Sequence, residues 1–364
     1  MLKNHDQKFI SYALNLAKRN IGITAPNPVV GCVIVKNGKI ISSAVTAKNG
    51  RPHAEKIAIE KIFNKEDLFD AEIYITLEPC AHFGQTSPCV DEIIKYKFKK
   101  VVIATPDPDK RVNGKSIEKL RQASIEVVLG VCQKEAQEIN RAFFKVRNFG
   151  LPFVTLKLAT SLDGKIATKN FDSKWITHQK ARFFSHYLRS INDAILVGAT
   201  TAKKDNPRLD CRISGLEKFS PKRVIISNEL DFDLGLNIFQ NTAEIPTIIL
   251  TSSKKQITKN FPAEIIFCQE KSGKVDLVDA LQKLCLKGVN SVLIEGGSFV
   301  ATQFLKENLV DELVWIRSSK IIGNDGIPAI GNLNFGLISE VLDNFKRTQF
   351  KDLEEDLAEI FRKK

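Results

Sequence analysis

The sequence predicts an α/β protein with two domains. Its 364 residues are enough for two domains of ordinary size, each with its own core. Helical and strand-like patterns alternate through both halves, and Gly and Pro interrupt the pattern at residues 147–153. Apolar residues make up 43% of the chain and charged residues 26%, which is typical of a folded globular protein and not of a disordered one.

The first domain is expected to span residues 1–147. Apolar residues at helical spacing, such as Phe9 and Ala13, predict a helix over residues 6–19. Asn37-Gly38 lies between two strand-like runs and is a strong signal for a β-hairpin. We expect strands at 29–35, 39–45, 72–77, 100–105 and 125–130, and further helices at about 53–63, from Pro88, near 115–123 and from 133 to about 147. The alternation predicts helices layered on a mostly buried sheet.

A linker is expected at residues 148–152, followed by a second domain over residues 153–364. The pattern restarts there with "FVTLKLA", a strand-like run. We expect its strands at 153–159, 194–198, 222–227, 246–251, 263–267, 291–295 and 311–316, and its helices near 177–190, 276–287 and 298–307. This half is therefore also predicted to be α/β.

Composition restricts the compartment and the partners. No apolar run approaches about 18 residues, so we expect no membrane span. The first 20 residues lack the apolar stretch of a signal peptide, and seven cysteines, an odd number, indicate reduced thiols, so we expect a cytoplasmic protein. The net charge of +12 is compatible with nucleic acid, a phosphorylated small substrate or a lysine-rich surface, and the scattered lysines favour the last of these.

A candidate metal site lies in the first domain. His53, Cys80 and Cys89 supply one imidazole and two thiolates, a known ligand set for catalytic zinc, which keeps a fourth position for water. Pro52 predicts that His53 lies at the cap of a helix, with Glu55 in the first turn, where its carboxylate can move protons without binding the metal. Cys89 follows Pro88 at another expected helix start, where the helix dipole should lower the thiol pKa.

Other interpretations of these residues remain open. A closed structural zinc site would need a fourth ligand, and His82 is the nearest candidate, although its spacing from Cys80 is awkward for joint ligation. The two cysteines could also be buried core thiols without a metal.

The motifs around these ligands resemble a known family. His-Ala-Glu followed by Pro-Cys is similar to the zinc-dependent cytidine-deaminase superfamily. The eight residues between the cysteines, together with "TAPNPVVGCVIVKNGKII", "TLEPC" and "TPDPDKRVNGKS", resemble the deaminase half of bifunctional riboflavin-biosynthesis deaminase/reductases. This resemblance implies a cytidine-deaminase-like α/β/α layer domain that hydrolytically deaminates a diamino-ribosylaminopyrimidinone phosphate. It also implies that Glu55 is catalytic and that Asn27 lines the substrate pocket.

The chain departs from that family at the substrate pocket. Thr46 stands where the family has a pocket histidine, Gln85 where it has a basic residue that meets the substrate phosphate, and Phe83 where it has a second histidine. A charged hydrogen bond to the phosphate contributes about 1.5–3 kcal/mol. We therefore expect the chemistry to survive and the affinity or the substrate identity to change.

The second half resembles the reductase half of the same family. The resemblance rests on "LKLATSLDGKIA", "SKWIT", "DAILVGATTAKKDNPRLDCR" and "IEGGSFVATQFLKENLVDEL", and it implies a dihydrofolate-reductase-like α/β domain that uses NADPH to reduce a ribosyl group. The cofactor residues implied are Ala159, Trp175, Thr201, Asp205, Ser227, Gly297 and Ser298. The substrate residues implied are Ser173, Arg189, Leu209, Arg212 and Glu295.

Several of these residues have plainer interpretations. Trp175 could belong to the core, and Arg189 could be a solvated residue at the C-terminal end of a helix. Glu295-Gly296-Gly297-Ser298 could be only a turn before a helix, although its bare backbone amides can also approach a phosphate.

Two other functions compete with the bifunctional enzyme. One is a nucleic-acid or other pyrimidine deaminase with a fused binding domain, and the other is a reductase whose deaminase half has decayed. For the bifunctional enzyme we expect one zinc per chain, NADPH, a phosphorylated pyrimidine substrate, no nucleic-acid or membrane partner, and a homo-oligomer as the family commonly forms.

Overall fold

The computed structural model describes residues 2–83, 87–253 and 260–364. The chain divides into two units, Met1–Gly150 and Leu151–Lys364. Among the described residues, no helix combines the length and the apolar character needed to cross a membrane.

In the described part of the first unit, five strands form a mixed sheet in the order β2-β1-β3-β4-β5. The pairs β1–β2 and β1–β3 are antiparallel, and β3–β4 and β4–β5 are parallel. The strands are β1 (Gly31–Lys36), β2 (Lys39–Val45), β3 (Glu72–Ile75), β4 (Lys100–Ile103) and β5 (Glu126–Leu129). The helices are α1 (Leu2–Lys18), α2 (Ala54–Glu60), α3 (Cys89–Lys95), α4 (Lys115–Gln122), α5 (Gln133–Ile139) and α6 (Arg141–Phe149).

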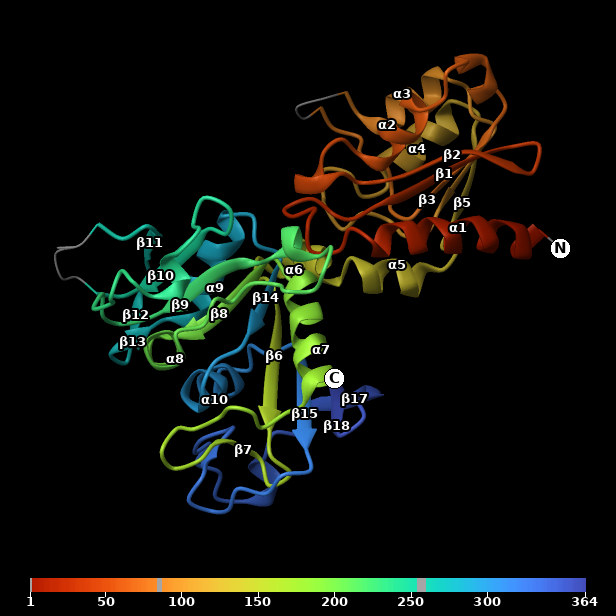
Figure 1. Cartoon of the computed structure of the whole chain (residues 1–364). Helices are drawn as coiled ribbons and strands as arrows, with labels where there is room; N and C mark the ends of the chain where they lie inside the picture. Colours follow the sequence, from red (N-terminus) through yellow and green to blue (C-terminus); the bar gives the residue numbers. More distant parts are fainter. Residues whose placement is uncertain (1, 84–86, 254–259) are drawn as a thin grey trace. The chain divides into compact units, whose positions relative to one another are not determined.

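The alternation of side chains along the strands produces three layers. Ile34 and Ile73 point into a core shared with α2, α3 and α4, whereas Val33 and Tyr74 point into a core shared with α1 and α5. Figure 1 shows these two groups of helices on opposite sides of the sheet. The first unit is thus the α/β/α layer domain that the sequence predicted.

The hairpin predicted at Asn37-Gly38 is confirmed. Both residues have positive φ, 50° and 75°, as a two-residue turn between antiparallel strands requires. The single helix predicted from 133 to about 147 is wrong, because the chain forms α5 and α6 with a break at Asn140. The side chain of Asn140 is buried and bonds both the N–H and the C=O of Val29, each at 2.9 Å. The helix α6 continues to Phe149, so residues 148–149 of the expected linker are helical.

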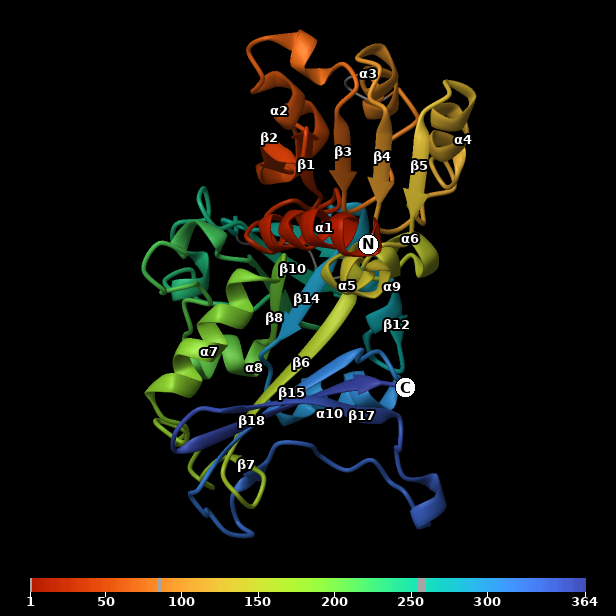
Figure 2. The same cartoon turned by 90° about the vertical axis from the view of Figure 1, so that its right-hand side faces the viewer.

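In the described part of the second unit, nine strands form a sheet in the order β11-β10-β9-β8-β14-β6-β15-β18-β17. The pairs are parallel except for β15–β18 and β17–β18. These strands are β6 (Phe153–Thr160), β8 (Ala194–Gly198), β9 (Lys222–Ile226), β10 (Thr247–Thr251), β11 (Glu264–Phe267), β14 (Ser291–Ile294), β15 (Glu312–Ser318), β17 (Phe345–Asp352) and β18 (Asp356–Lys363). Figure 2 shows β6 between β14 and β15 at the middle of the sheet.

Helices cover both faces of this sheet. The helices are α7 (Gln179–Ser190), α8 (Ala199–Asp205), α9 (Leu277–Leu286) and α10 (Ser298–Lys306). One core joins α9 and α10 to the sheet, and the other joins α7 and α8 to its opposite face. Two small ribbons lie outside the sheet, β12 (Glu270–Lys271) with β13 (Lys274–Val275) and β7 (Lys165–Ala167) with β16 (Ile327–Pro328). The sequence did not predict these ribbons, α8, or the hairpin of β17 and β18.

Candidate functional site

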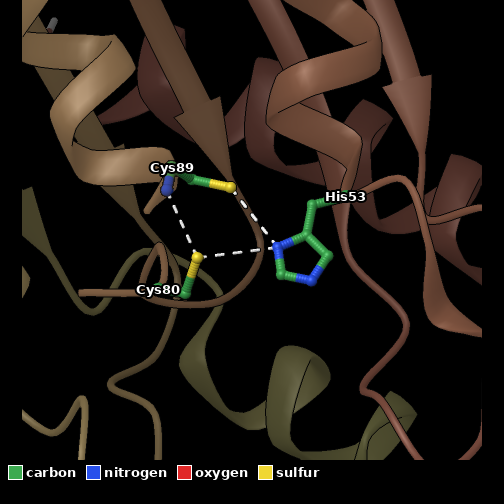
Figure 3. Close-up of side chains that lie close together, drawn as sticks. All are labelled: His53, Cys80 and Cys89. Atoms are coloured by element: carbon green, nitrogen blue, oxygen red, sulfur yellow. Dashed lines mark hydrogen bonds between the residues drawn. The ribbon is translucent and has the colours of Figure 1, made fainter. Parts of the chain in front are cut away.

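The three predicted metal ligands converge in the first unit. His53 is the N-cap of α2 with extended backbone, Cys89 is the first residue of α3 after Pro88, and Cys80 lies on the loop after β3. His53 Nδ1 lies 3.3 Å from Cys89 Sγ and 3.6 Å from Cys80 Sγ (Figure 3). Each residue offers one ligand atom within 4.8 Å of the other two. The helix starts predicted at Pro52 and Pro88 therefore place these side chains as expected.

The two thiols differ in acidity. Cys80 Sγ accepts a hydrogen bond from the backbone N–H of Cys89 at 3.2 Å. Hydrogen bonding from Cys89, and then from His53, lowers the pKa of Cys80 to about 4, so that Cys80 is a thiolate. The hydrogen bond with Cys80, burial and the nearby Glu55 raise the pKa of Cys89. The prediction that the helix start lowers the Cys89 pKa is therefore wrong in this arrangement, because the neighbouring Cys80 thiolate outweighs the dipole.

Glu55 lies in the first turn of α2, as predicted, and only 3% of the residue is exposed. Burial raises the pKa of its carboxyl group. Its Oε2 atom has no hydrogen-bond partner among the described residues. A buried carboxylate oxygen without a partner is costly, which indicates a missing ligand or water beside it.

This constellation fits a zinc ion. One imidazole nitrogen and two sulfurs are zinc donors, and three protein ligands leave the position for water that a catalytic site keeps. Among the described residues His82 is not part of the ligand cluster, which argues against the closed structural site. The unpartnered oxygen of Glu55 is available to the water.

The cavity next to this cluster contains the other predicted pocket residues. Asn27 and Thr46 line it together with His53, Glu55 and Cys80. The amide of Asn27 donates to Gly50 O at 3.1 Å, and the Thr46 hydroxyl accepts from Val30 N–H at 2.9 Å. Thr46 therefore lies in the pocket wall where the family has its histidine, but its hydroxyl group is hydrogen-bonded to the backbone of Val30.

The other two departures from the family are Phe83 and Gln85, and some lining residues of this pocket were not predicted. Phe83 is 79% exposed, and Gln85 lies outside the described residues. Five charged residues that were not predicted as site residues also line the cavity: Arg51, Asp107, Asp109, Arg111 and Arg147. Of these, Asp107, Asp109 and Arg111 belong to the motif "TPDPDKRVNGKS".

The second unit holds a cavity of about 690 Å³ that collects most of the predicted reductase residues. They are Ala159, Ser173, Trp175, Arg189, Thr201, Asp205, Arg212, Glu295 and Gly297. A neighbouring cavity of about 470 Å³ shares Thr201 and Gly297 and adds Ser227. In the described part of the chain, Leu209 and Ser298 line neither cavity, and Leu209 is buried in the core of α7 and α8.

In the larger cavity, Glu295 pairs with two basic side chains. Its carboxylate accepts two hydrogen bonds from Arg189, at 2.8 and 3.0 Å, and one from Lys157 Nζ at 3.3 Å. Although burial raises its pKa, Arg189 and Lys157 together lower it well below the usual range, so the carboxylate stays ionised. Arg189 is therefore a buried ion-pair partner, and the interpretation as a solvated helix-end residue is wrong.

A histidine that the sequence analysis missed, His186, contacts Arg212 and approaches the same carbonyl, Asp210 O, to which Arg189 donates. His186 Nε2 accepts a hydrogen bond from Arg212 Nε at 3.3 Å, and its Nδ1 lies 3.1 Å from Asp210 O. Burial, with Arg189 and Arg212 nearby, lowers the His186 pKa and favours the neutral ring. Lys157 was also missed, although it is the single charged residue of the strand run and was a usable signal.

The structure also gives the surroundings of Trp175 and of the two glycines before α10. Trp175 is 60% exposed, which excludes the core interpretation, and the Arg182 guanidinium lies 4.7 Å from its ring centroid. A Cβ on Gly296 would come within 2.9 Å of Val300, so close packing requires glycine there. Gly297 is the N-cap of α10 and lines both cavities.

Comparisons with known proteins agree with the two units. Residues 3–105 match the family model of the cytidine and deoxycytidylate deaminase zinc-binding region, and residues 152–357 match that of the RibD C-terminal domain. The chain is 40% identical over 363 residues to riboflavin biosynthesis protein RibD of Aquifex aeolicus, covering 100% of both chains. It is 34% identical to that of Escherichia coli, covering 88% of this chain and 89% of the other.

Solved structures of full-length relatives have the same fold. Acinetobacter baumannii RibD, form 2, superposes with a TM-score of 0.91 at 32% identity. A diaminohydroxyphosphoribosylaminopyrimidine deaminase/5-amino-6-(5-phosphoribosylamino)uracil reductase from Thermotoga maritima superposes with a TM-score of 0.90 at 36% identity. Both comparisons cover 100% of each chain.

Proposed function

The chain belongs to the RibD family of riboflavin biosynthesis proteins, and we propose that the residues described above carry out its two reactions. The protein is a bifunctional enzyme with a zinc-dependent deaminase unit and an NADPH-dependent reductase unit. The match of residues 152–357 to the RibD C-terminal domain argues against the alternative that the second half is a fused nucleic-acid-binding domain.

His53, Cys80 and Cys89 hold the zinc ion of the deaminase. When bound, zinc supplies the Lewis acidity that allows a water to ionise near neutral pH. Glu55 takes the proton of that water on its carboxylate and passes it to the ring nitrogen of the pyrimidine, while the oxygen of the water bonds to the ring carbon that bears the 2-amino group. The proton of the new hydroxyl group then passes through Glu55 to the amino group, the C–N bond breaks, ammonia leaves, and a carbonyl remains on the ring. The convergence of the three ligands beside the unpartnered Glu55 Oε2 is the observation that carries this proposal.

Asn27 and Thr46 form the wall against which the pyrimidine lies. The intact ligands and Glu55 support an active deaminase and argue against a decayed one. Thr46 and Gln85 then change the substrate affinity and leave the proton transfers unaffected, because neither replaces a ligand or the carboxylate.

The larger cavity of the second unit is the reductase site. Ala159, Trp175, Thr201, Asp205 and Gly297 line the NADPH path, and Ser227 and Ser298 are assigned to the same cofactor. NADPH supplies the hydride that converts the ribosyl group to a ribityl chain. Ser173, Arg212 and the Glu295–Arg189 pair hold the substrate phosphate and base. Leu209, also assigned to the substrate, lies in the core of α7 and α8, and its role at the substrate remains a prediction.

The cytoplasm is the proposed compartment, supported by seven cysteines that are all free of disulfides. The proposed partner is a phosphorylated pyrimidine, with no nucleic acid or membrane. Assembly as a homo-oligomer remains a prediction.

Glu55→Gln tests the deaminase assignment. Ammonia release from the diamino-ribosylaminopyrimidinone phosphate should fall by about 10²–10⁴-fold, since positioned acid–base catalysis contributes that much. NADPH oxidation with the already deaminated compound should be unchanged. Glu60→Gln is a matched control, because Glu60 is on the same helix but its side chain is 58% exposed. Failure of the zinc-loaded, folded wild type to release ammonia would refute the deaminase assignment.

A further inference from the structure

The reductase unit has two adjoining cavities that together can hold a dinucleotide. They meet at Thr201 and Gly297, where the first amides of α10 can face a pyrophosphate. Hydride transfer requires the nicotinamide to touch the substrate, and the larger cavity contains Arg212 and Glu295. Resting on the proposed function, this arrangement leaves the smaller cavity to the adenosine half.

We propose that Lys271 and Lys274 form a subsite in the smaller cavity for the 2′-phosphate of NADPH, and that this pair discriminates NADPH from NADH. Among the described residues that line this cavity, these lysines are the only side chains with a full positive charge. The 2′-phosphate is the one anionic group of NADPH that NADH lacks. A cation pair in the adenosine cavity therefore acts on the single difference between the two cofactors.

The backbone places both lysines on one side of a hairpin. Lys271 and Lys274 are directly opposite each other in the β12–β13 ribbon, whose strands are labelled in Figure 1. Ser272 and Gly273 connect them with positive φ values of 52° and 72°, the geometry of a tight type I′ turn. Side chains at opposite positions point to the same face with Cβ atoms about 5 Å apart. Like charges in such a pair repel each other, and a bound dianion between them removes that repulsion.

Asn228 fixes this hairpin to the cavity wall. Its Nδ2 donates to Gly273 O at 2.6 Å, and its Oδ1 accepts from Val275 N–H at 3.1 Å. Asn228 directly follows Ser227, which is assigned to the cofactor and lines the same cavity. These two hydrogen bonds therefore fix the position of the lysine pair beside the expected adenosine.

The charges in this cavity leave room for an anion. Glu307 is the only carboxylate among its described lining residues, and it lies 3.3 Å from Lys271 Nζ. Lys274 has no carboxylate partner within the described residues, and its Nζ lies 4.7 Å from the ring centroid of Phe299. Two cations and one anion give the cavity a net charge of +1 before the cofactor binds. A phosphate can pair with Lys274 without displacing any group and can share Lys271 with Glu307.

The test measures binding of two small nucleotides by titration calorimetry at pH 8, where a phosphate monoester is a dianion. The probes are 2′,5′-ADP, which carries the 2′-phosphate, and 5′-AMP, which lacks it. The wild type should prefer 2′,5′-ADP by about ten- to a hundred-fold, the range that charge-assisted hydrogen bonds give. In Lys271→Gln/Lys274→Gln this preference should disappear, while the affinity for 5′-AMP should be unchanged. Lys274→Arg should retain the preference.

Lys306→Gln is the control for charge alone, because Lys306 is an exposed lysine of α10 that lies outside the cavity. It should bind both probes as the wild type does. If the double variant keeps the preference, or loses affinity for both probes equally, the lysine pair is not the subsite, and the reductase assignment stands. If the wild type binds neither probe nor NADPH itself, both this inference and the proposed reductase site are refuted.

Discussion

The buried ion pair between Arg189 and Glu295 can be perturbed from either side. Arg189→Met removes two charge-assisted hydrogen bonds to Glu295, at 2.8 and 3.0 Å, and one to Asp210 O at 3.0 Å. The side chains of Glu295 and Arg189 are only 10% and 13% exposed, so water replaces the lost partner poorly. Glu295 is left with a single bond to Lys157 at 3.3 Å.

Breaking a buried pair from one side costs about 3–5 kcal/mol of unfolding free energy. We expect this loss for Arg189→Met. Lys157→Met removes one longer hydrogen bond and leaves Glu295 with both bonds to Arg189, so its cost should be smaller, about 1.5–3 kcal/mol. Replacing both charges by apolar groups is often close to neutral. Replacing Glu295 also removes the partner of Lys157, so the matching change is the triple variant Lys157→Met/Arg189→Met/Glu295→Leu, which should be more stable than Arg189→Met alone.

Urea unfolding followed by tryptophan fluorescence measures this directly. The two tryptophans of the chain, Trp175 and Trp315, both belong to the second unit, so the signal reports that unit. Arg347→Met is the control, because Arg347 pairs with Glu359 at 2.7 Å but its side chain is 59% exposed, and the loss should stay within about 1 kcal/mol. Equal losses for Arg189→Met and the control, or additive losses in the triple variant, would refute the reasoning.

Three further predictions concern the sites. Cys89→Ser should lose zinc, measured by metal analysis, and ammonia release with it, while NADPH-dependent reduction persists; a strong chelator should reproduce this in the wild type. Arg212→Ala should raise the KM of the reductase substrate about 10- to 100-fold, whereas Arg208→Ala, an exposed arginine that also contacts Asp210 but lies outside the cavity, should not. Folding lowers the pKa of His186, so the unfolded chain binds more protons below about pH 6.5 and the second unit should lose stability as the pH falls from there. His186→Gln should weaken this pH dependence, measured as the difference between urea unfolding midpoints at pH 7.5 and 5.5. An unchanged pH dependence in the variant would contradict the prediction.

Local signals predicted much of the first site. Pro52 and Pro88 indicated helix starts, and both helices begin where expected, with His53 at one cap and Cys89 at the other start. Glu55 follows His53 by two residues, so the first turn of α2 places it beside the ligands. The Asn37-Gly38 turn was also predicted, since positive φ at both positions is a property of the turn residues themselves.

The edge strand β17 carried too little pattern to be found. In β17, seven of the eight residues are exposed, so the apolar alternation that identifies a strand is absent. Its charged side chains are those expected on the edge of a sheet, where they discourage further pairing. Only pairing with β18 reveals this strand.

What the sequence by itself determined is what neighbouring residues encode: the element order, the helix caps, the tight turn and the set of zinc donors. What only the tertiary structure decided depends on residues far apart in the chain. Asn140 breaks a helix because it meets Val29, 111 residues away, and Glu295 is ionised because Arg189, 106 residues away, meets it inside the cavity. The proton distribution between Cys80 and Cys89 likewise depends on distances that no spacing contains. Periodicity and capping act over a few residues, whereas burial and charge pairing act through space, and the fold alone determines which groups meet.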